Sequence, residues 1–549
     1  MPMIVVCILS LLAGCGVFIA GMNQMSGSLE KATGKGLKNL LGKIGNNRFA
    51  SVGIGASITA IIQSSSATSV MVVGLVNAGV LSLFQATAII MGANIGTTVT
   101  GLLVSLSSLN ISLFTSVFAF IGVMMMFIKN DKVKNIGATL CGLGLIFVGL
   151  ELISNAFDNI EVKDFFVQLF SKIDFPLLLI LVGIIFTGVV QSSSAVTGVI
   201  IIMVGQGALT MENALFLILG SNIGTCVTAL MATIGTNANA KRTGLIHLLF
   251  NVFGAVLFTI FIWIFKAEVV QLLEKLFPNN AQFQIAVFHI FFNVVTTLLL
   301  LPFIRQLVTL STWIIKDKKE ESEVLRLKYI DERLLKTPMI AFVQVKKEVE
   351  YMASLAKQNL DAAMQELMTS TKVGKEKILQ VEKKINYMNN EITRFLIQLA
   401  PLMNDANENA LGSYFHVVND IERIGDHAEN LIDIQKVLDD EHEAFSEEGK
   451  ESIQSMYQLI QKMFTLSMET FDETAEAHLQ ELNQLEEKVD TLKEQLTNQH
   501  YLRLSSGNCK VELNSLFISI VSNLERVGDH LVNIGNSIKN PTGDDKCED

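Results

Sequence analysis

Long stretches of this sequence lack charge, and that absence indicates the class of protein. No Asp, Glu, Lys or Arg occurs between Phe49 and Ile128. As an α-helix, this segment would be about 120 Å long, several times the roughly 30 Å hydrocarbon core of a bilayer. We therefore expect the first part of the chain to cross the lipid bilayer several times.

Other absences exclude functional classes. The chain has 6 Cys and no C-x-x-C pair, which argues against a disulfide framework and agrees with a reducing compartment for its polar part. It has no nucleotide-binding loop, catalytic triad or histidine cluster, so we predict that it is not an enzyme and uses no ATP. Leu12–Cys15 reads like a lipoprotein cleavage box, but no Lys or Arg precedes it, so we expect a retained first helix.

The charge is divided unevenly along the chain. Residues 1–315 carry a net charge of +5 and residues 316–549 a net charge of −16. This division predicts a membrane domain followed by an acidic soluble domain, and the acidity argues against a nucleic-acid partner. The predicted segments are a transmembrane domain (1–315), a charged linker (316–344), a soluble domain (345–540) and a tail (541–549).

The membrane domain contains a duplicated polar motif. Gln63-Ser64-Ser65-Ser66 recurs 128 positions later as Gln191-Ser192-Ser193-Ser194, and 17 of the 38 positions of 63–100 match those of 191–228. In both copies an Asn in a Gly-x-Asn-Ile-Gly-Thr segment follows 31 residues after the Gln. Polar runs are costly in lipid unless they face protein, water or a ligand. Such a duplication in two apolar halves is typical of a transporter with repeat symmetry.

Each Gln-Ser-Ser-Ser run lies at the centre of an apolar stretch whose arms are too short to span a bilayer. We predict two re-entrant hairpins, at about 49–80 and 175–207, within repeat blocks at 49–128 and 175–265. The Gly-x-Asn-Ile-Gly-Thr segments predict a break in the helix that follows each hairpin. The fold class is therefore all-α, with a polytopic membrane domain built from two repeats.

The chemistry of the tips follows from their neutral oxygens. The aligned blocks contain no Lys or Arg, so a guanidinium clamp for an anion is absent. Serine hydroxyls and helix N-termini can instead donate to an oxyanion, and hydroxyl and amide oxygens can hold Na⁺. The mundane alternative is that these hydroxyls bond back to a carbonyl one turn earlier.

The paired motif resembles the signature of the sodium-dependent phosphate cotransporter family, over roughly residues 1–315. The resemblance implies an inverted repeat whose tips bind inorganic phosphate, with Na⁺ as the coupling ion. The substrate-binding residues it implies are Gln63, Ser64, Ser65, Ser66, Asn94, Thr97, Gln191, Ser192, Ser193, Ser194, Asn222 and Thr225. The sodium ligands it implies are Gln63, Ser66, Gln191 and Ser194.

The acidic half carries a second duplication. Glu422-Arg423-Ile424-Gly425-Asp426-His427 recurs 103 residues later as Glu525-Arg526-Val527-Gly528-Asp529-His530. We predict two three-helix bundles, at about 345–437 and 449–540, with the motif on the third helix of each. Two carboxylates four positions apart share a helix face and can hold a cation, or they can form a solvated face with salt bridges.

These segments resemble the PhoU family of phosphate-signalling regulators. That resemblance implies divalent or transition-metal sites at Glu422 and Asp426 and at Glu525 and Asp529. Lysines after the last apolar segment predict a cytoplasmic soluble domain, so we expect a multi-pass protein of the bacterial inner (plasma) membrane. A homo-oligomer and a cytoplasmic regulatory partner both stay open.

Three functions fit these features. The first is sodium-coupled secondary transport of inorganic phosphate, regulated by the acidic domain. The others are a phosphate exporter of the same fold and a membrane-anchored phosphate sensor without net transport.

Overall fold

The computed structural model describes most of the chain as helix. The described residues are 3–42, 47–109, 112–173, 175–316, 325–369, 374–403, 405–473, 476–506 and 509–537. Within these ranges there is no strand, so the predicted all-α fold class is confirmed. The chain divides between residues 320 and 321 into two compact units. The predicted tail (541–549) and residues 317–324 of the predicted linker lie outside the described ranges.

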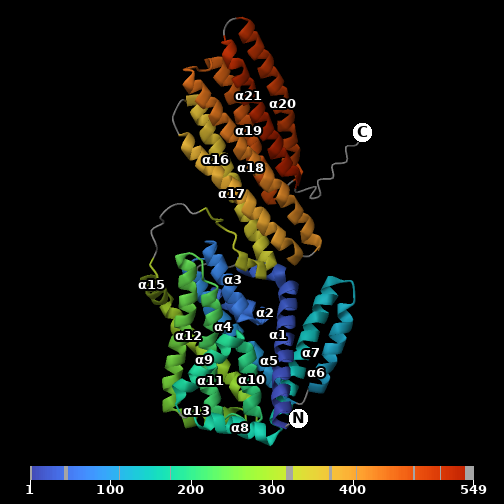
Figure 1. The fold of residues 1–549 in the computed structure, drawn as a ribbon, viewed down its shortest axis with the longest axis vertical. Coiled ribbons are helices and arrows are strands. Elements are labelled where there is room, and N and C mark those ends of the chain that lie inside the picture. The colour runs from blue at the N-terminus through green and yellow to red at the C-terminus, as the bar shows by residue number, and fades with distance from the viewer. Residues whose placement is uncertain are drawn as a thin grey trace. The chain divides into compact units, whose positions relative to one another are not determined.

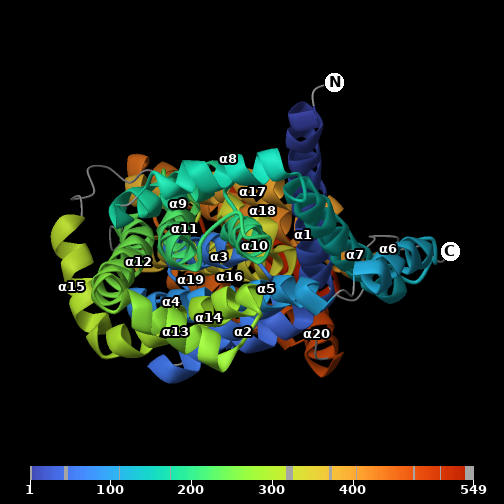
Figure 2. The same ribbon diagram turned by 90° about the horizontal axis from the view of Figure 1, so that it is seen from below.

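The first unit consists of apolar helices (Figures 1 and 2). They are α1 (Met3–Gly42), α2 (Arg48–Ile62), α3 (Ser65–Asn77), α4 (Leu83–Gly96), α5 (Thr98–Ser105), α6 (Ser112–Met126), α7 (Asp131–Phe157), α8 (Ile160–Ser171), α9 (Pro176–Val190), α10 (Ser193–Gly205), α11 (Met211–Met231), α12 (Ala238–Ile264), α13 (Lys266–Leu276), α14 (Ala281–Leu300) and α15 (Ile304–Ile314). Six stretches of the described residues are long and apolar enough to cross a membrane.

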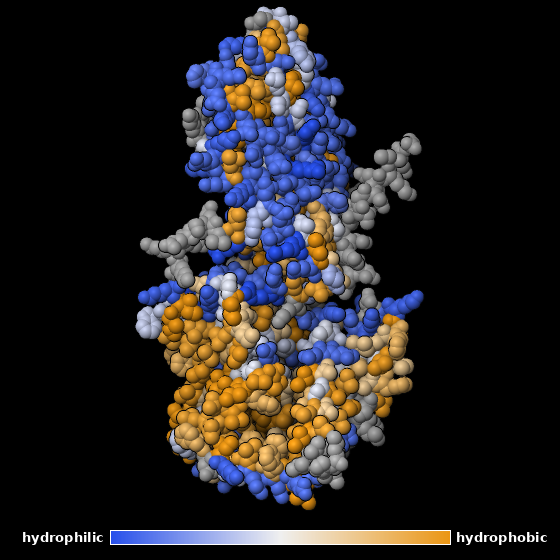
Figure 3. Space-filling model, viewed as in Figure 1, coloured by the Kyte–Doolittle hydropathy of each residue, from blue (hydrophilic) through white to orange (hydrophobic). Residues whose placement is uncertain are grey.

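The surface of this unit agrees with a lipid environment. Large apolar side chains are exposed on its outer helices, among them Phe120 of α6, Val189 of α9 and Trp263 of α12. Figure 3 shows a broad hydrophobic surface over the first unit, whereas the second unit is mainly hydrophilic. In a soluble protein an apolar surface of this kind would be a liability, but in a bilayer it is the contact surface. The prediction of a polytopic membrane domain is confirmed.

Both predicted hairpins are present as pairs of short helices. The first is α2 followed by α3, and the second is α9 followed by α10; the two arms have 15 and 13 residues in each copy. Such arms are about 20 Å long and cannot span the hydrocarbon core alone. Neither arm is therefore a membrane span of its own.

The predicted break in the second copy is wrong. In the first copy α4 ends at Gly96 and α5 begins at Thr98, but α11 continues through Asn222 and Gly224 without interruption. A glycine inside a helix costs about 1 kcal/mol, an amount that packing readily offsets. Here the glycines allow close packing between helices, and they do not terminate the second one.

Two equivalent glycines allow backbone contact between each hairpin and the next helix. A Cβ atom added at Gly92 of α4 would lie 2.0 Å from the carbonyl oxygen of Val52 in α2. A Cβ atom at Gly220 of α11 would lie 2.1 Å from the carbonyl oxygen of Ile180 in α9. Small residues at helix interfaces are the usual way in which membrane helices pack closely. Each hairpin is thus fixed to the following helix of its own half.

The second unit consists of two three-helix bundles, as predicted. The first contains α16 (Pro338–Thr369), α17 (Lys375–Leu399) and α18 (Asp405–Asp440); the second contains α19 (Glu447–Glu473), α20 (Glu476–Ser505) and α21 (Asn514–Ser537). Apolar residues at helical spacing form the cores, for example Ile385, Met388 and Ile392 of α17, all fully buried. The duplicated motif lies on the third helix of each bundle, where α18 packs against α21.

The segment before α16 is anchored to it. The buried carboxylate of Glu348 accepts the backbone N–H groups of Lys328 (3.0 Å), Tyr329 and Ile330 (3.1 Å). Helix α16 begins at Pro338, inside the segment that was predicted to be linker. Of that predicted linker, the described part from residue 325 onward therefore packs as part of the second unit.

The glycine contacts generate a test of the membrane fold. Gly220→Ala should destabilise the protein by about 3 kcal/mol, because the added methyl group meets backbone and not a movable side chain. Gly53→Ala is the matched control, since a Cβ atom at Gly53 has no atom within 4 Å. Thermal unfolding of the purified proteins in detergent measures the difference. Equal melting temperatures for the two variants would show that the contact is not tight.

Candidate functional site

The two hairpin tips share an unusual backbone conformation. Gln63 (φ 59°) and Gln191 (φ 56°) end α2 and α9 in the left-handed region. A residue with a Cβ atom pays about 1–2 kcal/mol for this conformation, and glycine would avoid that cost. Strain of this kind is concentrated at functional sites. The presence of Gln at both turns therefore points to a role for its side-chain amide.

At each tip, one serine hydroxyl caps a helix and the next makes no hydrogen bond within the described residues. Ser64 and Ser192 cap α3 and α10 by accepting the N–H groups of Ala67 (3.1 Å) and Ala195 (3.2 Å). Ser65 and Ser193 begin these helices, are 5% exposed, and make no side-chain hydrogen bond with the described residues. Each tip thus combines an unpaired hydroxyl with a helix N-terminus, an arrangement that suits an oxyanion.

Each tip contacts the opposite half of the unit. The hydroxyl of Ser66 lies 3.3 Å from that of Thr228 in α11, and the hydroxyl of Ser194 lies 3.4 Å from that of Thr100 in α5. Ser66 and Ser194 are 128 positions apart, and so are Thr100 and Thr228. The contacts are therefore reciprocal. Each tip therefore lies against the helix that follows the other tip, and these residues form one polar centre.

Four neutral oxygens, including the hydroxyl of Thr100, lie close together. This hydroxyl donates to Oε1 of Gln63 at 2.9 Å and accepts from Ser194, which also lies 3.5 Å from the hydroxyl of Thr97. Hydroxyl and amide oxygens without a fixed charge are suitable ligands for a hard cation such as Na⁺. Three of the four residues, Gln63, Thr97 and Ser194, were predicted from the sequence.

The two halves differ in their glutamines. Gln63 is 5% exposed and held by Thr100, whereas Gln191 is exposed and has no side-chain hydrogen bond among the described residues. Thr228, the counterpart of Thr100, donates instead to the carbonyl of Thr225 at 2.9 Å. The duplicated sequence thus holds one tip in a closed polar network and leaves the other more open.

The two asparagines differ in the same way. Oδ1 of Asn222 lies 3.1 Å from Nε2 of His289, and its Nδ2 donates to Asn293 at 3.0 Å. Asn94 is 3% exposed, and its Nδ2 has no hydrogen-bond partner in the described part of the chain. A buried amide of this kind costs roughly 1–3 kcal/mol unless something accepts its hydrogen. Asn94 is therefore the stronger ligand candidate of the two.

Thr225, which was predicted to bind substrate, donates to the carbonyl of Ser221 at 3.1 Å, a common bond for a hydroxyl within a helix.

Several residues at this centre were not predicted from the sequence. Thr100 and Thr228 were identifiable, because each is the last residue of its duplicated Asn-Ile-Gly-Thr-x-Val-Thr segment. His289 and Asn293 were identifiable from a repeated His-x-x-x-Asn pattern, present at 247–251 and again at 289–293.

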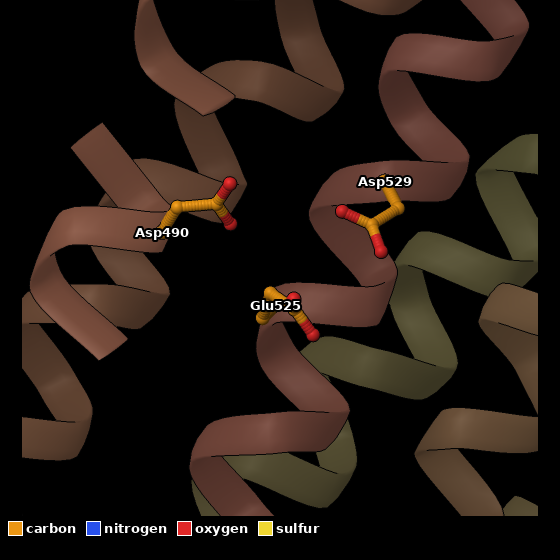
Figure 4. A group of neighbouring side chains, drawn as sticks. All are labelled: Asp490, Glu525 and Asp529. Atoms are coloured by element: carbon orange, nitrogen blue, oxygen red, sulfur yellow. The ribbon is translucent and has the colours of Figure 1, made fainter. Parts of the chain in front are cut away.

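The second unit brings carboxylates together at the second copy of its motif. Oxygens of Asp490, Glu525 and Asp529 lie within 4.8 Å of one another (Figure 4). Burial raises the pKa of Asp529, and the charges of Glu525 and Asp490 raise it further. A bound cation would relieve this repulsion. The Nζ of Lys493 already relieves part of it, because it lies 2.9 Å from Glu525.

The first copy has a different third member. Glu382 of α17 is 2% exposed, and neither of its carboxylate oxygens accepts a hydrogen bond in the described residues. Burial, together with the charges of Asp426, Glu429 and Glu422, raises the pKa of Glu382 to about 8. Glu382 is thus buried close to like charges, but among the described residues the carboxylate oxygens that lie within 4.8 Å of one another as a group of three are those of Asp490, Glu525 and Asp529.

Glu382 and Asp490 lie on the second helix of their bundles, and for this reason the motif alone did not predict them. Gly425 explains how Glu382 fits, since a Cβ atom at that glycine would lie 2.4 Å from Glu382 Oε2. The glycine of the motif therefore makes room for a carboxylate from the neighbouring helix. Its counterpart, Gly528, faces apolar side chains at ordinary contact distances.

Family models match both units of the chain. A model described as Na⁺/Pi-cotransporter matches residues 17–155 and 162–277, and a model described as PhoU domain matches residues 349–434 and 453–538. No solved structure matches the chain.

Individual relatives resemble the chain over different lengths. "Putative inorganic phosphate export protein YjbB" of Escherichia coli (strain K12) is 24% identical over 548 residues, which cover 99% of each chain. "Uncharacterized protein YqeW" of Bacillus subtilis is 30% identical over 286 residues, 52% of this chain and 91% of that protein. "Sodium-dependent phosphate transport protein 2A" of Mus musculus is 34% identical over 98 residues, 18% of this chain and 15% of that protein.

The raised pKa of Glu382 predicts a pH dependence of stability. Unfolding returns the carboxyl to its ordinary pKa near 4.5, so between that pH and about 8 the folded state binds the extra proton. Stability should therefore fall by a few kcal/mol as pH rises through this window, because the folded state must then bury the charge.

Glu382→Gln should remove most of this slope and stabilise the metal-free protein at pH 8. Thermal unfolding between pH 5 and pH 8, with chelator present, measures it. Glu376→Gln is the control, because Glu376 is exposed on the same helix. A slope that is the same in wild type and in Glu382→Gln would contradict the prediction.

Proposed function

Because the chain belongs to the Na⁺/Pi-cotransporter family and carries a PhoU domain, we propose that it transports inorganic phosphate across the membrane in coupling with Na⁺. The observation that carries the proposal is the polar centre shared by the two tips. Two helices begin there with unpaired hydroxyls, and a cluster of neutral oxygens lies beside them. An oxyanion and a cation that bind together neutralise each other, so the centre needs no fixed charge.

Distinct residues serve the two ions in this proposal. Phosphate accepts hydrogen bonds from Ser65, Ser193 and the first N–H groups of α3 and α10, while Asn94 offers a further amide donor. Na⁺ takes Gln63, Thr97, Thr100 and Ser194 as ligands. Ser66 and Gln191 are the equivalents of Ser194 and Gln63 in the other copy of the motif.

The remaining predicted residues hold the site in shape. Ser64 and Ser192 keep the two helix N-termini in place as caps. Asn222 joins α11 to α14 through Asn293, and Thr225 donates back to the carbonyl of Ser221 within α11.

The second unit is proposed as the regulatory part, located in the cytoplasm of a cell whose inner (plasma) membrane holds the first unit. Metal binding at its carboxylate groups would change the charge of both bundles. Export is a second candidate for the direction of transport, favoured by the name of the Escherichia coli relative, which resembles this chain over its whole length. A sensor without net transport is distinguished from both by flux.

Loss of either unpaired hydroxyl should impair transport. Ser65→Ala and Ser193→Ala should each weaken phosphate affinity about tenfold to a hundredfold, because a hydrogen bond to a charged group contributes about 1.5–3 kcal/mol. Radiolabelled phosphate flux in proteoliposomes, with Na⁺ gradients of either direction, measures affinity, coupling and direction together.

Ser51→Ala is the matched control, since Ser51 is buried in α2 but lies near its start, away from the tip. Wild-type kinetics in both tip variants would refute the substrate site. Phosphate binding without any flux would favour the sensor.

The oxygen cluster predicts a separate effect on Na⁺. Thr100→Val preserves shape but removes the hydroxyl that joins Gln63 to Ser194, so the Na⁺ concentration for half-maximal flux should rise about tenfold. Thr139→Val is the control, because the hydroxyl of Thr139 bonds only within α7, to Asn135 at 2.9 Å. If the Na⁺ dependence of Thr100→Val matches that of wild type, the cluster does not bind the coupling ion.

A further inference from the structure

One histidine of the membrane unit is held in a closed chain of hydrogen bonds. His289 of α14 is 2% exposed, and its Nε2 lies 3.1 Å from Oδ1 of Asn222 in α11. Nδ2 of Asn222 donates to Oδ1 of Asn293 at 3.0 Å, and Nδ2 of Asn293 donates to the backbone carbonyl of His289 at 2.9 Å. The chain of bonds thus starts and ends at His289.

The direction of these bonds determines which ring nitrogen carries the proton. A backbone carbonyl can only accept, so Asn293 turns its amide nitrogen toward it and its oxygen toward Asn222. Asn222 then has its oxygen toward Nε2 of His289, which must donate. No carboxylate is bonded to this ring in the described part of the chain, and an isolated buried charge is costly, so the ring is neutral. Nδ1 of His289 is therefore an acceptor.

This acceptor has no donor. Nδ1 of His289 is buried and makes no hydrogen bond with the described residues. A Cβ atom added at Gly101 of α5 would lie 3.7 Å from Nδ1 and 3.8 Å from the methyl group of Thr197 in α10. These are ordinary contact distances, so the missing side chain of Gly101 leaves room for one atom of about the size of a methyl group or an oxygen. The hydroxyl of Thr197 is likewise buried, with no partner in the ranges that the structure describes.

The space at Gly101 lies beside the proposed ion site. Gly101 follows Thr97 by four positions, and so lies one helical turn beyond it. Thr97 lies 3.5 Å from the hydroxyl of Ser194 at the second tip. On α10, Thr197 lies one turn after Ser193, whose hydroxyl is proposed to bind phosphate. The space is thus one turn away from residues proposed to bind each ion.

An acceptor adds something that the other phosphate ligands do not provide. The tip hydroxyls, the helix N-termini and the amide of Asn94 serve the proposed anion as donors. Sulfate accepts such hydrogen bonds as phosphate does, so donors alone do not separate the two anions. At neutral pH, phosphate still carries a hydrogen and sulfate carries none. A buried acceptor can pair with the hydrogen of phosphate, but it would face only lone pairs of sulfate.

We propose that Nδ1 of His289 accepts a hydrogen bond from the hydroxyl group of a protonated tetrahedral oxyanion, and so selects hydrogen phosphate or hydrogen arsenate over sulfate. The inference rests on the proposed function, because the anion must occupy the polar centre. A buried polar group that pairs with a ligand hydroxyl disfavours the analogue that lacks it. Asn222 and Asn293 hold the imidazole in the tautomer that this role requires.

Competition in a binding assay tests the proposal without relying on flux. Full-length protein in detergent, with Na⁺ present, binds radiolabelled inorganic phosphate at neutral pH, and unlabelled arsenate or sulfate is added. In wild type, displacement should need much more sulfate than arsenate. His289→Gln can keep a donor near Asn222 but loses the ring acceptor. The ratio of the displacing concentrations, sulfate over arsenate, should therefore fall at least about tenfold.

Gly101→Ala tests the space in front of the acceptor, and it carries the test if His289→Gln fails to fold. The added methyl group meets other atoms only at ordinary contact distances, so the fold should be retained, but it occupies the place of the ligand hydroxyl. The same ratio should fall about tenfold.

Two variants are matched controls and should keep the wild-type ratio. A Cβ atom at Gly53 has no atom within 4 Å, so Gly53→Ala adds a methyl group without contact. His247→Gln changes a buried histidine of the same His-x-x-x-Asn pattern, whose ring makes no hydrogen bond with the described residues. Thermal unfolding of each variant shows whether its fold is retained.

The outcomes separate this inference from the proposed function. Wild-type protein that binds phosphate but releases it to sulfate as readily as to arsenate would overturn the inference alone. A ratio that is unchanged in both His289→Gln and Gly101→Ala, or that shifts equally in His247→Gln, would also overturn it. Failure of the wild type to bind phosphate would overturn both proposals. Binding with the expected selectivity, but without flux in proteoliposomes, would support the inference and contradict transport.

Discussion

The fold of the membrane unit depends on one constraint: the polar side chains at the two hairpin tips must find polar partners. Each hairpin places Gln and three Ser in the middle of apolar sequence, where an unpaired donor or acceptor costs several kcal/mol. The structure meets this need across the two halves, through Ser66 with Thr228 and Ser194 with Thr100. The first tip is in addition held within its own half, where Thr100 donates to Gln63. The same contacts that stabilise the fold therefore bring the two tips together and form the centre at which ions are proposed to bind.

The sequence predicted the parts of the fold that depend on local pattern. Short apolar arms around a polar run indicated the hairpins, and the duplicated Gln-Ser-Ser-Ser indicated where their tips lie. The predicted break in the helix that carries Asn222 was wrong. The same Gly-flanked segment can interrupt a helix, as near Thr97, or can pack closely within a continuous one, as at Gly220. Which of these occurs depends on the neighbouring helix, and that information is absent from the segment itself.

The duplicated motifs also could not predict the side chains that other helices contribute to each site, because those contacts depend on how the helices pack. Glu382 and Asp490 complete carboxylate groups that begin on α18 and α21, yet they lie outside the duplicated residues. His289 likewise reaches Asn222 from a helix that follows in the chain. The histidines of the duplicated acidic-unit motif, whose rings stack, are a further example. The sequence placed both on the third helices of their bundles, but it did not indicate that these two helices pack together.

The glycine contacts join each hairpin tightly to the helix that follows it. α2 with α4, and α9 with α11, touch through backbone atoms at a distance that leaves no room for sliding. Between the halves, the tips make hydroxyl pairs at 3.3–3.5 Å, which can exchange partners with water or an ion, and α3 packs against α12 and α5 against α14. Each hairpin and its helix are thus expected to move as one rigid body. The polar centre then lies between two such bodies, so the proposed ion site is also a place where any movement of one half against the other would be felt.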